Sequence, residues 1–266
     1  MKIGIAGCAG RMGRLLLTAS LQNPQFQLIG GTVRSGHPAA GKDIGFLLGC
    51  SDLGLKIVTD AAALFPHLDV FIDFSSPEAS VHHSALAQEA GVALVIGTTG
   101  LNQAQEQKLK AAAQHIPLVY AANTSIGVTL LQALVRQAAA HLPVEWDIEI
   151  FEMHHRHKVD APSGTALALG RAAAQGREVD HDRVAVLTRT GKTGLRPEGA
   201  IGYASLRGGD VVGDHTVIFA GPKERIELAH KAGGRDIYAE GALHAALWVC
   251  RQKPGLYSMH DVLGIQ

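Results

Sequence analysis

A short apolar run leads directly into a glycine-rich turn at the start of the chain. Residues 2–6 are KIGIA, and residues 7–13 are GCAGRMG, followed by a Leu-rich stretch of helical character. A strand, a tight glycine turn and a helix in this order present backbone N–H groups and a positive helix end to a phosphate. Ala9 stands at the middle glycine of the common G-x-G-x-x-G motif. A purely structural turn is the alternative, but the position after the first strand favours a dinucleotide site.

Apolar runs alternate with helical patterns through the first 125 residues. Strands are predicted over residues 2–6, 27–33, 69–74, 92–96 and 118–120, and helices over residues 12–21, 77–90 and 102–115. Helices between buried strands are typical of βαβ units, because parallel neighbours need a long crossover connection. The first half therefore predicts an α/β fold, a Rossmann-type doubly wound parallel sheet covered on both faces.

The pattern changes after residue 125, where runs of alternating polar and apolar residues predict strands with one exposed face. These runs cover residues 145–152, 183–189, 200–207, 210–220 and 225–231, with helices predicted over 128–140, 163–174 and 236–249. We therefore predict an α+β substrate domain with a mostly antiparallel sheet over residues 126–235. Residues 1–125, completed by 236–266, form the predicted dinucleotide-binding domain.

Charge balance and cysteine spacing exclude several classes of protein. Lysine plus arginine number 24 and aspartate plus glutamate number 24, so the overall positive charge of a nucleic-acid binder is absent. Cys8, Cys50 and Cys250 are too far apart to predict a disulfide framework or a zinc site. No apolar run approaches the roughly 18 residues that span a bilayer. We expect a cytoplasmic protein with no nucleic-acid or membrane partner.

The end of the second predicted strand bears on which dinucleotide binds. Val33 stands where NAD sites usually carry an acidic residue for the ribose hydroxyls, and Arg34 follows it. A guanidinium suits the 2′-phosphate of NADPH, and Arg11 would add a second positive charge. We predict that NADPH is preferred and that NADH also binds; a solvated surface charge is the alternative role for Arg34.

A dense set of ionisable side chains lies in residues 149–166, EIFEMHHRHKVDAPSGTA. Residues 154–158 hold three imidazoles, one guanidinium and one ammonium, and a Pro-Ser-Gly-Thr turn that opens a helix follows. Histidine can give a proton near neutral pH, lysine can polarise or protonate a substrate atom, and a helix start favours anions. The stretch therefore predicts a proton donor beside a carboxylate site. A solvated basic loop is one alternative; a metal site is the other, disfavoured by the two basic neighbours, and we expect no metal.

The same stretch resembles a known family. It matches the signature E-[IV]-x-E-x-H-H-x-x-K-x-D-x-P-S-G-T-A of 4-hydroxy-tetrahydrodipicolinate reductase, also called dihydrodipicolinate reductase, of lysine and diaminopimelate biosynthesis. The resemblance extends over the whole chain. It includes residues 7–13, FIDF at 71–74, GTTG at 97–100, AN at 122–123 with Ser125, and GGDVVGDHT at 208–216.

The resemblance implies roles for individual residues. His154 resembles the family's catalytic proton donor or acceptor and Lys158 its second donor, while His155, Gly164 and Thr165 resemble its substrate carboxylate contacts. The positions similar to its cofactor contacts are Gly7, Cys8, Ala9, Gly10, Arg11, Met12, Arg34, Gly97, Thr98, Thr99, Ala121, Ala122, Asn123 and Thr124. Thr124 departs from members that place a phenylalanine against the cofactor.

The implied function is NAD(P)H-dependent reduction of a small cyclic dicarboxylate, with a homotetramer assembled through the substrate-domain sheets. Two alternatives stay open on the sequence alone. One is another NADPH-dependent reductase of the same architecture, and the other is a catalytically silent NADP-binding sensor. Intact His154 and Lys158 argue against the sensor, because nucleotide binding alone does not require them.

Overall fold

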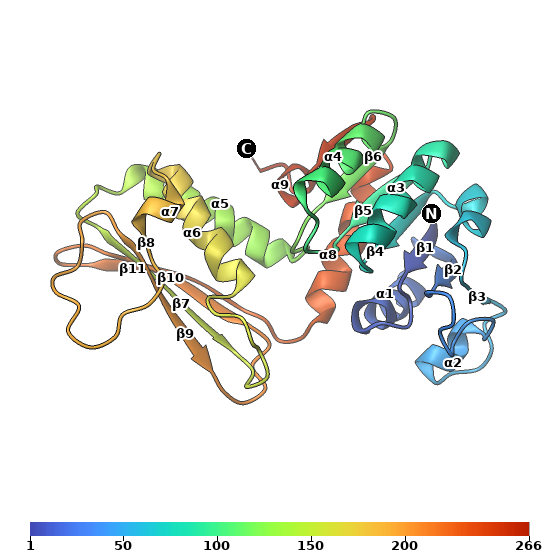
Figure 1. Cartoon of the computed structure of the whole chain (residues 1–266), viewed down its shortest axis with the longest axis horizontal. Coiled ribbons are helices and arrows are strands. Elements are labelled where there is room, and N and C mark those ends of the chain that lie inside the picture. Colours follow the sequence, from blue (N-terminus) through green and yellow to red (C-terminus); the bar gives the residue numbers. More distant parts are fainter. Residues whose placement is uncertain (266) are drawn as a thin grey trace. The chain divides into compact units, whose positions relative to one another are not determined.

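The computed structural model describes residues 1–265, which form two compact units with one sheet each (Figure 1). Unit 1 contains residues 1–126 and the segment from Arg235 onward, and unit 2 contains residues 127–234. Within residues 1–265, no helix has both the length and the apolar character needed to cross a membrane.

Unit 1 is built on a seven-stranded sheet in the order β12-β6-β5-β4-β1-β2-β3, with parallel neighbours throughout. The strands are β1 (Lys2–Ala6), β2 (Gln27–Thr32), β3 (Ile57–Val58), β4 (Val70–Asp73), β5 (Ala93–Ile96), β6 (Pro117–Tyr120) and β12 (Gly255–Tyr257). From β1 the chain builds outward to β2 and β3 on one side and to β4, β5 and β6 on the other. Ligands of such sheets bind beyond the carboxyl ends of the strands, where the order reverses.

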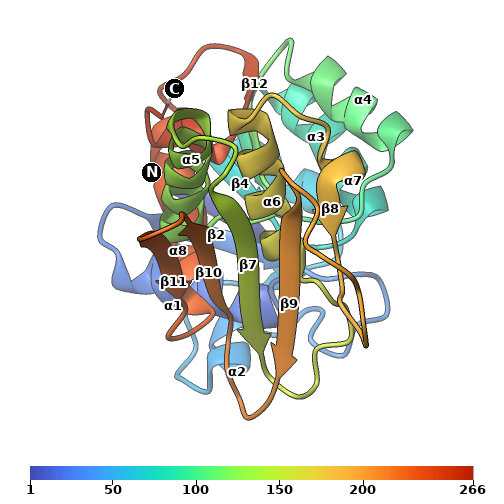
Figure 2. The same cartoon turned by 90° about the vertical axis from the view of Figure 1, so that its left-hand side faces the viewer.

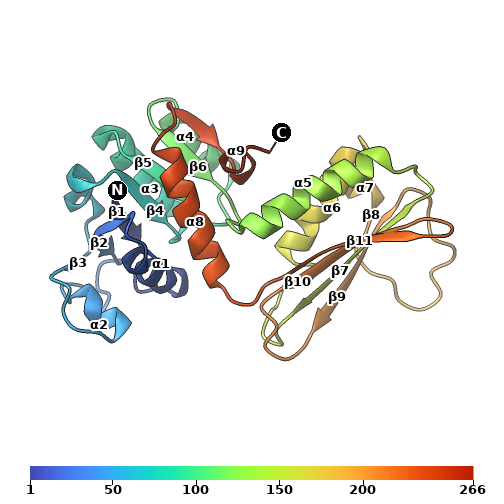
Figure 3. The same cartoon turned by 180° about the vertical axis from the view of Figure 1, so that it is seen from behind.

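Successive residues along the strands of unit 1 point to opposite faces of the sheet, and their side chains form two separate cores, one on each face. On one face, Ile3, Ile5 and Ile72 pack with α1 (Arg11–Gln22), α2 (Ile44–Leu48), α8 (Asp236–Val249) and α9 (Met259–Val262). On the other, Phe71 and Leu94 pack with α3 (Pro77–Ala90) and α4 (Gln103–Ala112). Figure 3 shows α8 beside α1. Burial on both faces explains why these strands are almost wholly apolar.

Unit 2 has a five-stranded mixed sheet in the order β11-β10-β7-β9-β8 (Figure 2). The strands are β7 (Asp147–His154), β8 (Ala185–Val186), β9 (Ile201–Arg207), β10 (Asp214–Ala220) and β11 (Arg225–Lys231). Buried and half-buried residues alternate along β7, as expected for a strand covered on one face. Helices α5 (Ile126–His141), α6 (Gly164–Gly176) and α7 (His181–Val184) lie on the covered face (Figures 1 and 2).

The α/β fold with a Rossmann-type sheet is confirmed, and two details differ from the prediction. Strand β10 is antiparallel to both its neighbours, whereas β7 and β8 both run parallel to β9, so the smaller sheet is mixed. The strand predicted over residues 183–189 is a two-residue strand, because the carboxyl of Asp180 caps a short helix that ends at Val184. The short elements α2, β3 and β12 carried too few residues for a periodic pattern.

Candidate active site

The turn between β1 and α1 is tightly packed and its helix start is open. Gly7 has φ +59°, a left-handed conformation that favours glycine, and a Cβ on Gly13 would come within 2.2 Å of the Gly7 carbonyl oxygen. Gly10 caps α1 without any side-chain hydrogen bond to the helix N–H groups. The first N–H groups of α1 therefore remain available to an anion such as a pyrophosphate.

Around this turn, the predicted cofactor residues differ in what they can offer a ligand. Cys8 is fully buried, its backbone N–H donates to Thr32 O at 2.9 Å, and burial raises the pKa of its thiol to about 11. Its side chain is therefore part of the core, and only its backbone can face a cofactor. Arg11 is exposed, and Ala9 and Met12 are half-buried.

The end of β2 presents an arginine to solvent and turns the preceding side chain inward. Val33 is 6% exposed and belongs to the core on the α1 face, whereas Arg34 is exposed. An acidic side chain at position 33 would have to enter that apolar core, which is unfavourable. The structure thus gives a packing reason for the missing ribose-binding carboxylate.

A buried carboxylate organises the ends of β4 and β5. Asp73, fully buried, accepts hydrogen bonds from the backbone N–H and hydroxyl of Ser75 and lies 2.8 Å from Nδ1 of His83. The Thr98 hydroxyl lies 3.3 Å from the same carboxylate and accepts from the Ser75 N–H at 3.0 Å. Gly97 faces the ring of Phe74 so closely that a Cβ would come within 2.1 Å of it. The Thr98 side chain is therefore held by Asp73 and Ser75. Thr99, the next residue, is exposed.

The segment after β6 is anchored on α8. The Thr124 hydroxyl donates to Tyr238 O at 2.7 Å, and a Cβ on Gly241 would come within 1.8 Å of Thr124 O. Because Thr124 is buried, its side chain supports the segment rather than facing solvent. Ala121 and Asn123 are half-buried and Ala122 is exposed, at the same carboxyl edge of the sheet.

In unit 2, a histidine and a glutamate occupy the covered face at the end of β7. His154 is 8% exposed and Glu152 is 1% exposed, and Nδ1 of His154 lies 2.5 Å from Oε2 of Glu152. Residues two apart on a strand share a face, so the pairing follows directly from the strand conformation. Opposite His154 on β9 lies Arg207, whose two terminal nitrogens contact the two carboxylate oxygens of Glu152 at 2.8 Å each.

The environment keeps Glu152 ionised and His154 weakly basic. Burial by itself raises the pKa of Glu152, but hydrogen bonds from Arg207, Ser205 and His154 outweigh it, and the pKa lies below its usual value. Burial lowers the pKa of His154 below its usual value, and the Glu152 carboxylate opposes that shift in part. A buried imidazole beside an ionised carboxylate is an arrangement that can give and take a proton near neutral pH.

The N-terminus of α6 lies against the same carboxylate. The backbone N–H of Ser163 donates to Oε1 of Glu152 at 3.2 Å, and the Ser163 hydroxyl caps the helix by accepting from the Ala166 N–H at 3.1 Å. Nε2 of His215 lies 3.0 Å from that hydroxyl, and burial lowers the pKa of His215 to about 4. Gly164 is exposed, with nothing within 4 Å of a Cβ built on it. Gly164 and Thr165 thus begin a helix whose start is accessible to an anion.

The loop after β7 carries the remaining predicted residues of unit 2. The backbone N–H groups of His155 and Arg156 donate to the carbonyls of Val211 and Gly209, at 2.7 and 3.1 Å. Lys158 is half-buried, and its Nζ lies 2.8 Å from the carboxylate of Asp160, whose carbonyl accepts from Arg207. His154 and Lys158 therefore both border the group centred on Glu152 and Arg207.

Three residues of this group were given no role by the sequence: Glu152, Arg207 and His215; Ser163 belongs to the predicted helix start. Strand alternation was the signal that could have found Glu152, because it places this carboxylate beside His154 on the buried face. Arg207 and His215 are 53 and 61 residues beyond His154 in the sequence (207 minus 154, 215 minus 154), and only the sheet register brings them there. No metal-binding group of three or more His, Cys, Asp or Glu side chains occurs within residues 1–265.

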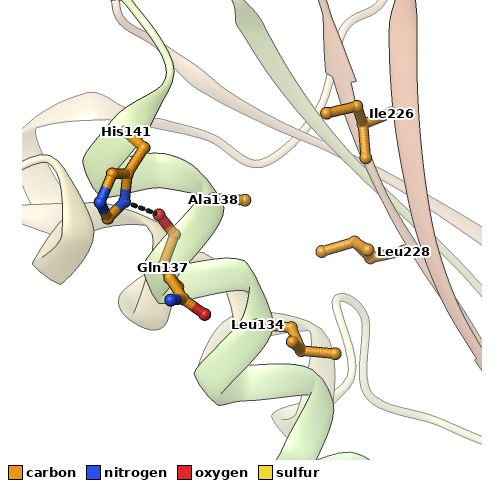
Figure 4. A pocket seen from close by; sticks show the side chains of 6 residues that line it. All are labelled: Leu134, Gln137, Ala138, His141, Ile226 and Leu228. Atoms are coloured by element: carbon orange, nitrogen blue, oxygen red, sulfur yellow. Dashed lines mark hydrogen bonds between the residues drawn. The ribbon is translucent and has the colours of Figure 1, made fainter.

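A cavity of about 340 Å³ lies elsewhere in unit 2, between α5 and β11 (Figure 4). Its walls are mainly apolar, and none of its lining residues belongs to the group around His154. They are Leu134, Gln137, Ala138, His141, Ile226 and Leu228. Because no Lys or Arg lines it, this cavity does not suit a dicarboxylate.

Family models match both halves of the chain. A model described as dihydrodipicolinate reductase, N-terminus, matches residues 1–124, and one described as dihydrodipicolinate reductase, C-terminus, matches residues 127–263. The 4-hydroxy-tetrahydrodipicolinate reductase of Parvibaculum lavamentivorans is 54% identical over 267 residues, covering 100% of this chain and 98% of that protein. The enzyme of the same name from Methylocella silvestris is 53% identical over 265 residues, covering 100% and 97%.

Solved structures agree with these matches. A dipicolinate-bound dihydrodipicolinate reductase from Paenisporosarcina sp. TG-14 has a TM-score of 0.78 at 25% identity, covering 98% of both chains. An amine dehydrogenase from Mycobacterium smegmatis has a TM-score of 0.62 at 13% identity, covering 97% of this chain and 95% of that one. The second likeness concerns the fold alone.

Proposed function

The chain belongs to the dihydrodipicolinate reductase family, and from this premise we propose how its residues carry out the reduction. Its activity is that of a 4-hydroxy-tetrahydrodipicolinate reductase, an NAD(P)H-dependent oxidoreductase of lysine and diaminopimelate biosynthesis. A hydride and a proton are added to the unsaturated cyclic dicarboxylate dihydrodipicolinate to give tetrahydrodipicolinate; starting from the 4-hydroxy compound, the hydroxyl group also leaves as water. The observation that carries the proposed roles is the buried His154–Glu152 pair beside the N-terminus of α6, where Gly164 is exposed.

Unit 1 is proposed to bind the dinucleotide. The open N-terminus of α1 suits the pyrophosphate, and the exposed backbone at Thr99 and Ala122 lies at the carboxyl edge of the sheet, where the nicotinamide end is expected. Arg34 is proposed to contact the 2′-phosphate of NADPH, because it is exposed and the neighbouring Val33 supplies no competing carboxylate. These features support a preference for NADPH, with NADH as a second cofactor.

Unit 2 is proposed to bind the substrate and supply the proton. The N-terminus of α6 at Gly164 and Thr165, together with His155, is proposed to bind one carboxylate, and Arg156 and Lys158 add positive charge for the second. When bound, the reduced nicotinamide supplies the hydride. His154 or Lys158 provides the proton that completes the reduction; His154 holds it in a buried ring, and Lys158 on a side chain that can leave Asp160.

Synthase-dependent oxidation of NADPH tests this function. Substrate is generated in situ from pyruvate and aspartate semialdehyde by a separate synthase, and absorbance is followed at about 340 nm with NADPH and then with NADH. Rapid oxidation that requires the synthase supports the assignment. No oxidation by folded protein that binds NADPH would instead favour another acid substrate or a silent nucleotide-binding role.

The role of Arg34 is tested by Arg34→Ala. Loss of a charge-assisted contact with the 2′-phosphate should raise KM for NADPH roughly tenfold or more, because such a bond contributes about 1.5–3 kcal/mol. NADH lacks that phosphate and is the matched control, so its KM should not change. Wild-type kcat/KM that clearly favours NADH, or an equal effect of Arg34→Ala on both cofactors, would contradict the proposal.

Assembly and location are proposed from the same premise. The face of the unit 2 sheet opposite the helices carries Phe151, Met153 and Ile218, which alternate with the buried residues. This partly apolar face supports assembly into a homotetramer through the sheets, which light scattering on the purified protein tests by molar mass. We further propose that the enzyme acts in the cytoplasm, which cell fractionation tests.

A further inference from the structure

The Glu152 carboxylate contacts both halves of the proposed substrate site. Oε2 lies 2.5 Å from Nδ1 of His154, and Oε1 accepts the backbone N–H of Ser163 at the start of α6. Arg207 contacts both oxygens from β9. We propose that Glu152 is a positioning residue that fixes the tautomer of His154 and holds the imidazole ring at a set position relative to the N-terminus of α6. The proposal rests on the proposed function, in which that ring exchanges a proton and that helix start binds a carboxylate.

The tautomer follows from the chemistry of the carboxylate. A buried carboxylate paired with a bidentate guanidinium is ionised, and an ionised carboxylate can only accept hydrogen bonds. Nδ1 of the neutral His154 ring must therefore carry the hydrogen, which leaves the lone pair on Nε2. In the protonated ring, Nε2 carries the proton that can be transferred.

The surroundings of Nε2 agree with this assignment. Gly213 lies beside it, and a Cβ at that position would come within 2.9 Å of Nε2. Within residues 1–265, the ring forms its one hydrogen bond through Nδ1. The charged or titratable groups that face His154 are Glu152 on its own strand, Arg207 on β9, His215 on β10 and Lys158 on the following loop. Glu152 is the anion among them, so its charge is the one that favours the protonated ring.

The second contact couples the ring to the helix. Ser163 donates its N–H to Glu152 and caps α6 with its hydroxyl, which also lies 3.0 Å from Nε2 of His215. Ser163 and Glu152 are both nearly inaccessible, at 2% and 1% exposure, so water does not substitute readily for either bond. A shift of the carboxylate would therefore move His154 and the start of α6 relative to each other.

Glu152→Gln is the decisive variant because its amide cannot satisfy both contacts. An –NH2 turned toward Nδ1 demands the opposite tautomer of His154, and one turned toward Ser163 opposes its N–H. Either orientation also places an N–H against Arg207. We expect kcat to fall roughly 10²-fold or more, by comparison with loss of the tautomer-setting carboxylate in hydrolase triads. The dissociation constant for NADPH, measured by fluorescence titration, should not change.

The pH profile separates positioning from a general structural role. Removing the anion should lower the pKa of His154 further, so the pH above which kcat declines should move about one unit or more toward acid. Glu149→Gln is the matched control: Glu149 lies on the same strand, faces the opposite side, and is also held by a bidentate arginine, Arg189. In Glu149→Gln, the pH above which kcat declines should be the same as in the wild type.

Each outcome decides the proposal. The proposal would be overturned if Glu152→Gln kept the wild-type kcat and pH profile. It would also be overturned if Glu152→Gln and Glu149→Gln lost kcat equally and neither changed the pH above which kcat declines. If Glu152→Gln does not fold, ¹⁵N shifts of labelled histidine in the wild-type protein decide instead, with His154 assigned from a His154→Gln spectrum. A hydrogen on Nδ1 supports the proposal and one on Nε2 overturns it. This measurement needs no turnover, so it is independent of failure of the proposed function.

Discussion

His154 and Lys158 are four residues apart and occupy different environments. His154 is buried against Glu152, whereas Lys158 is half-buried and pairs with the largely exposed Asp160. A buried ring with a lowered pKa is suited to exchange its proton, and an ammonium paired at the surface is suited to change partners when a substrate carboxylate arrives. The two groups therefore differ in how they can contribute to one proton transfer.

We expect His154→Ala and Lys158→Ala each to lower kcat roughly 10²–10⁴-fold, the usual contribution of a general acid. The double variant should lose less than the product of the two, because residues that act as a unit are not additive. His157→Ala, at an exposed position in the same loop, is the control and should keep kcat near the wild-type value. Steady-state kinetics check this; near-normal turnover in both single variants would remove the two residues from the mechanism.

At the scale of elements, α1 packs very closely against the β1–α1 turn, for which a cofactor-binding role is proposed above. The helix approaches the turn so closely that a Cβ on Gly13 would come within 2.2 Å of Gly7 O and 2.6 Å of Cys8 Cα. Both contacts are with backbone, which cannot move aside as a flexible side chain can. The position of the start of α1 therefore depends on the absence of a side chain at Gly13.

Gly13→Ala should lower the free energy of unfolding by about 1–3 kcal/mol, the usual cost of overpacking, and weaken NADPH binding by displacing the turn. Gly233→Ala is the matched control, since a Cβ there would meet nothing within 4 Å. Urea unfolding and fluorescence titration of NADPH provide the two readouts. If Gly13→Ala and the wild type had the same free energy of unfolding and the same affinity for NADPH, α1 could move away from the turn without loss of stability or binding, and the prediction would be wrong.

At the scale of the whole molecule, the buried histidines make stability depend on pH. The pKa of His215 is about 4 in the folded protein and near 6.5 ordinarily, because burial disfavours the charged ring. Between pH 6.5 and pH 4, His215 is mostly protonated in the unfolded chain but mostly neutral in the folded protein. The contribution of His215 to the free energy of unfolding is therefore present above pH 6.5 and is lost as the pH falls toward 4. Burial lowers the pKa of His154 and His230 as well, in the same direction.

We expect the free energy of unfolding to fall between pH 7 and pH 5, with His215 contributing roughly 2 kcal/mol. Carboxylates with lowered pKa values, Glu152 among them, extend the loss only below about pH 4.5. Urea unfolding at the two pH values, repeated with His215→Gln, measures the histidine contribution. A pH dependence that is the same in the variant as in the wild type would assign the loss to other groups.

The sequence by itself determined the class of fold and the family. Local patterns sufficed, because a buried strand, a glycine turn and an amphipathic helix each follow from neighbouring residues. The signature around His154 and Lys158 identified the dihydrodipicolinate reductase family, which the full-length matches confirm. The individual roles of the site residues stay predictions for the experiments above.

Only the tertiary structure shows which residues surround His154 and that the sheet of unit 2 is mixed. Arg207 and His215 reach His154 and Glu152 through the register of β9 and β10 on β7, and no local pattern encodes which strands become neighbours. Likewise Asp73 meets His83 and Thr98 because β4, α3 and β5 pack together. Local propensity depends on adjacent residues, whereas these polar contacts depend on burial and strand order, which the whole chain determines together.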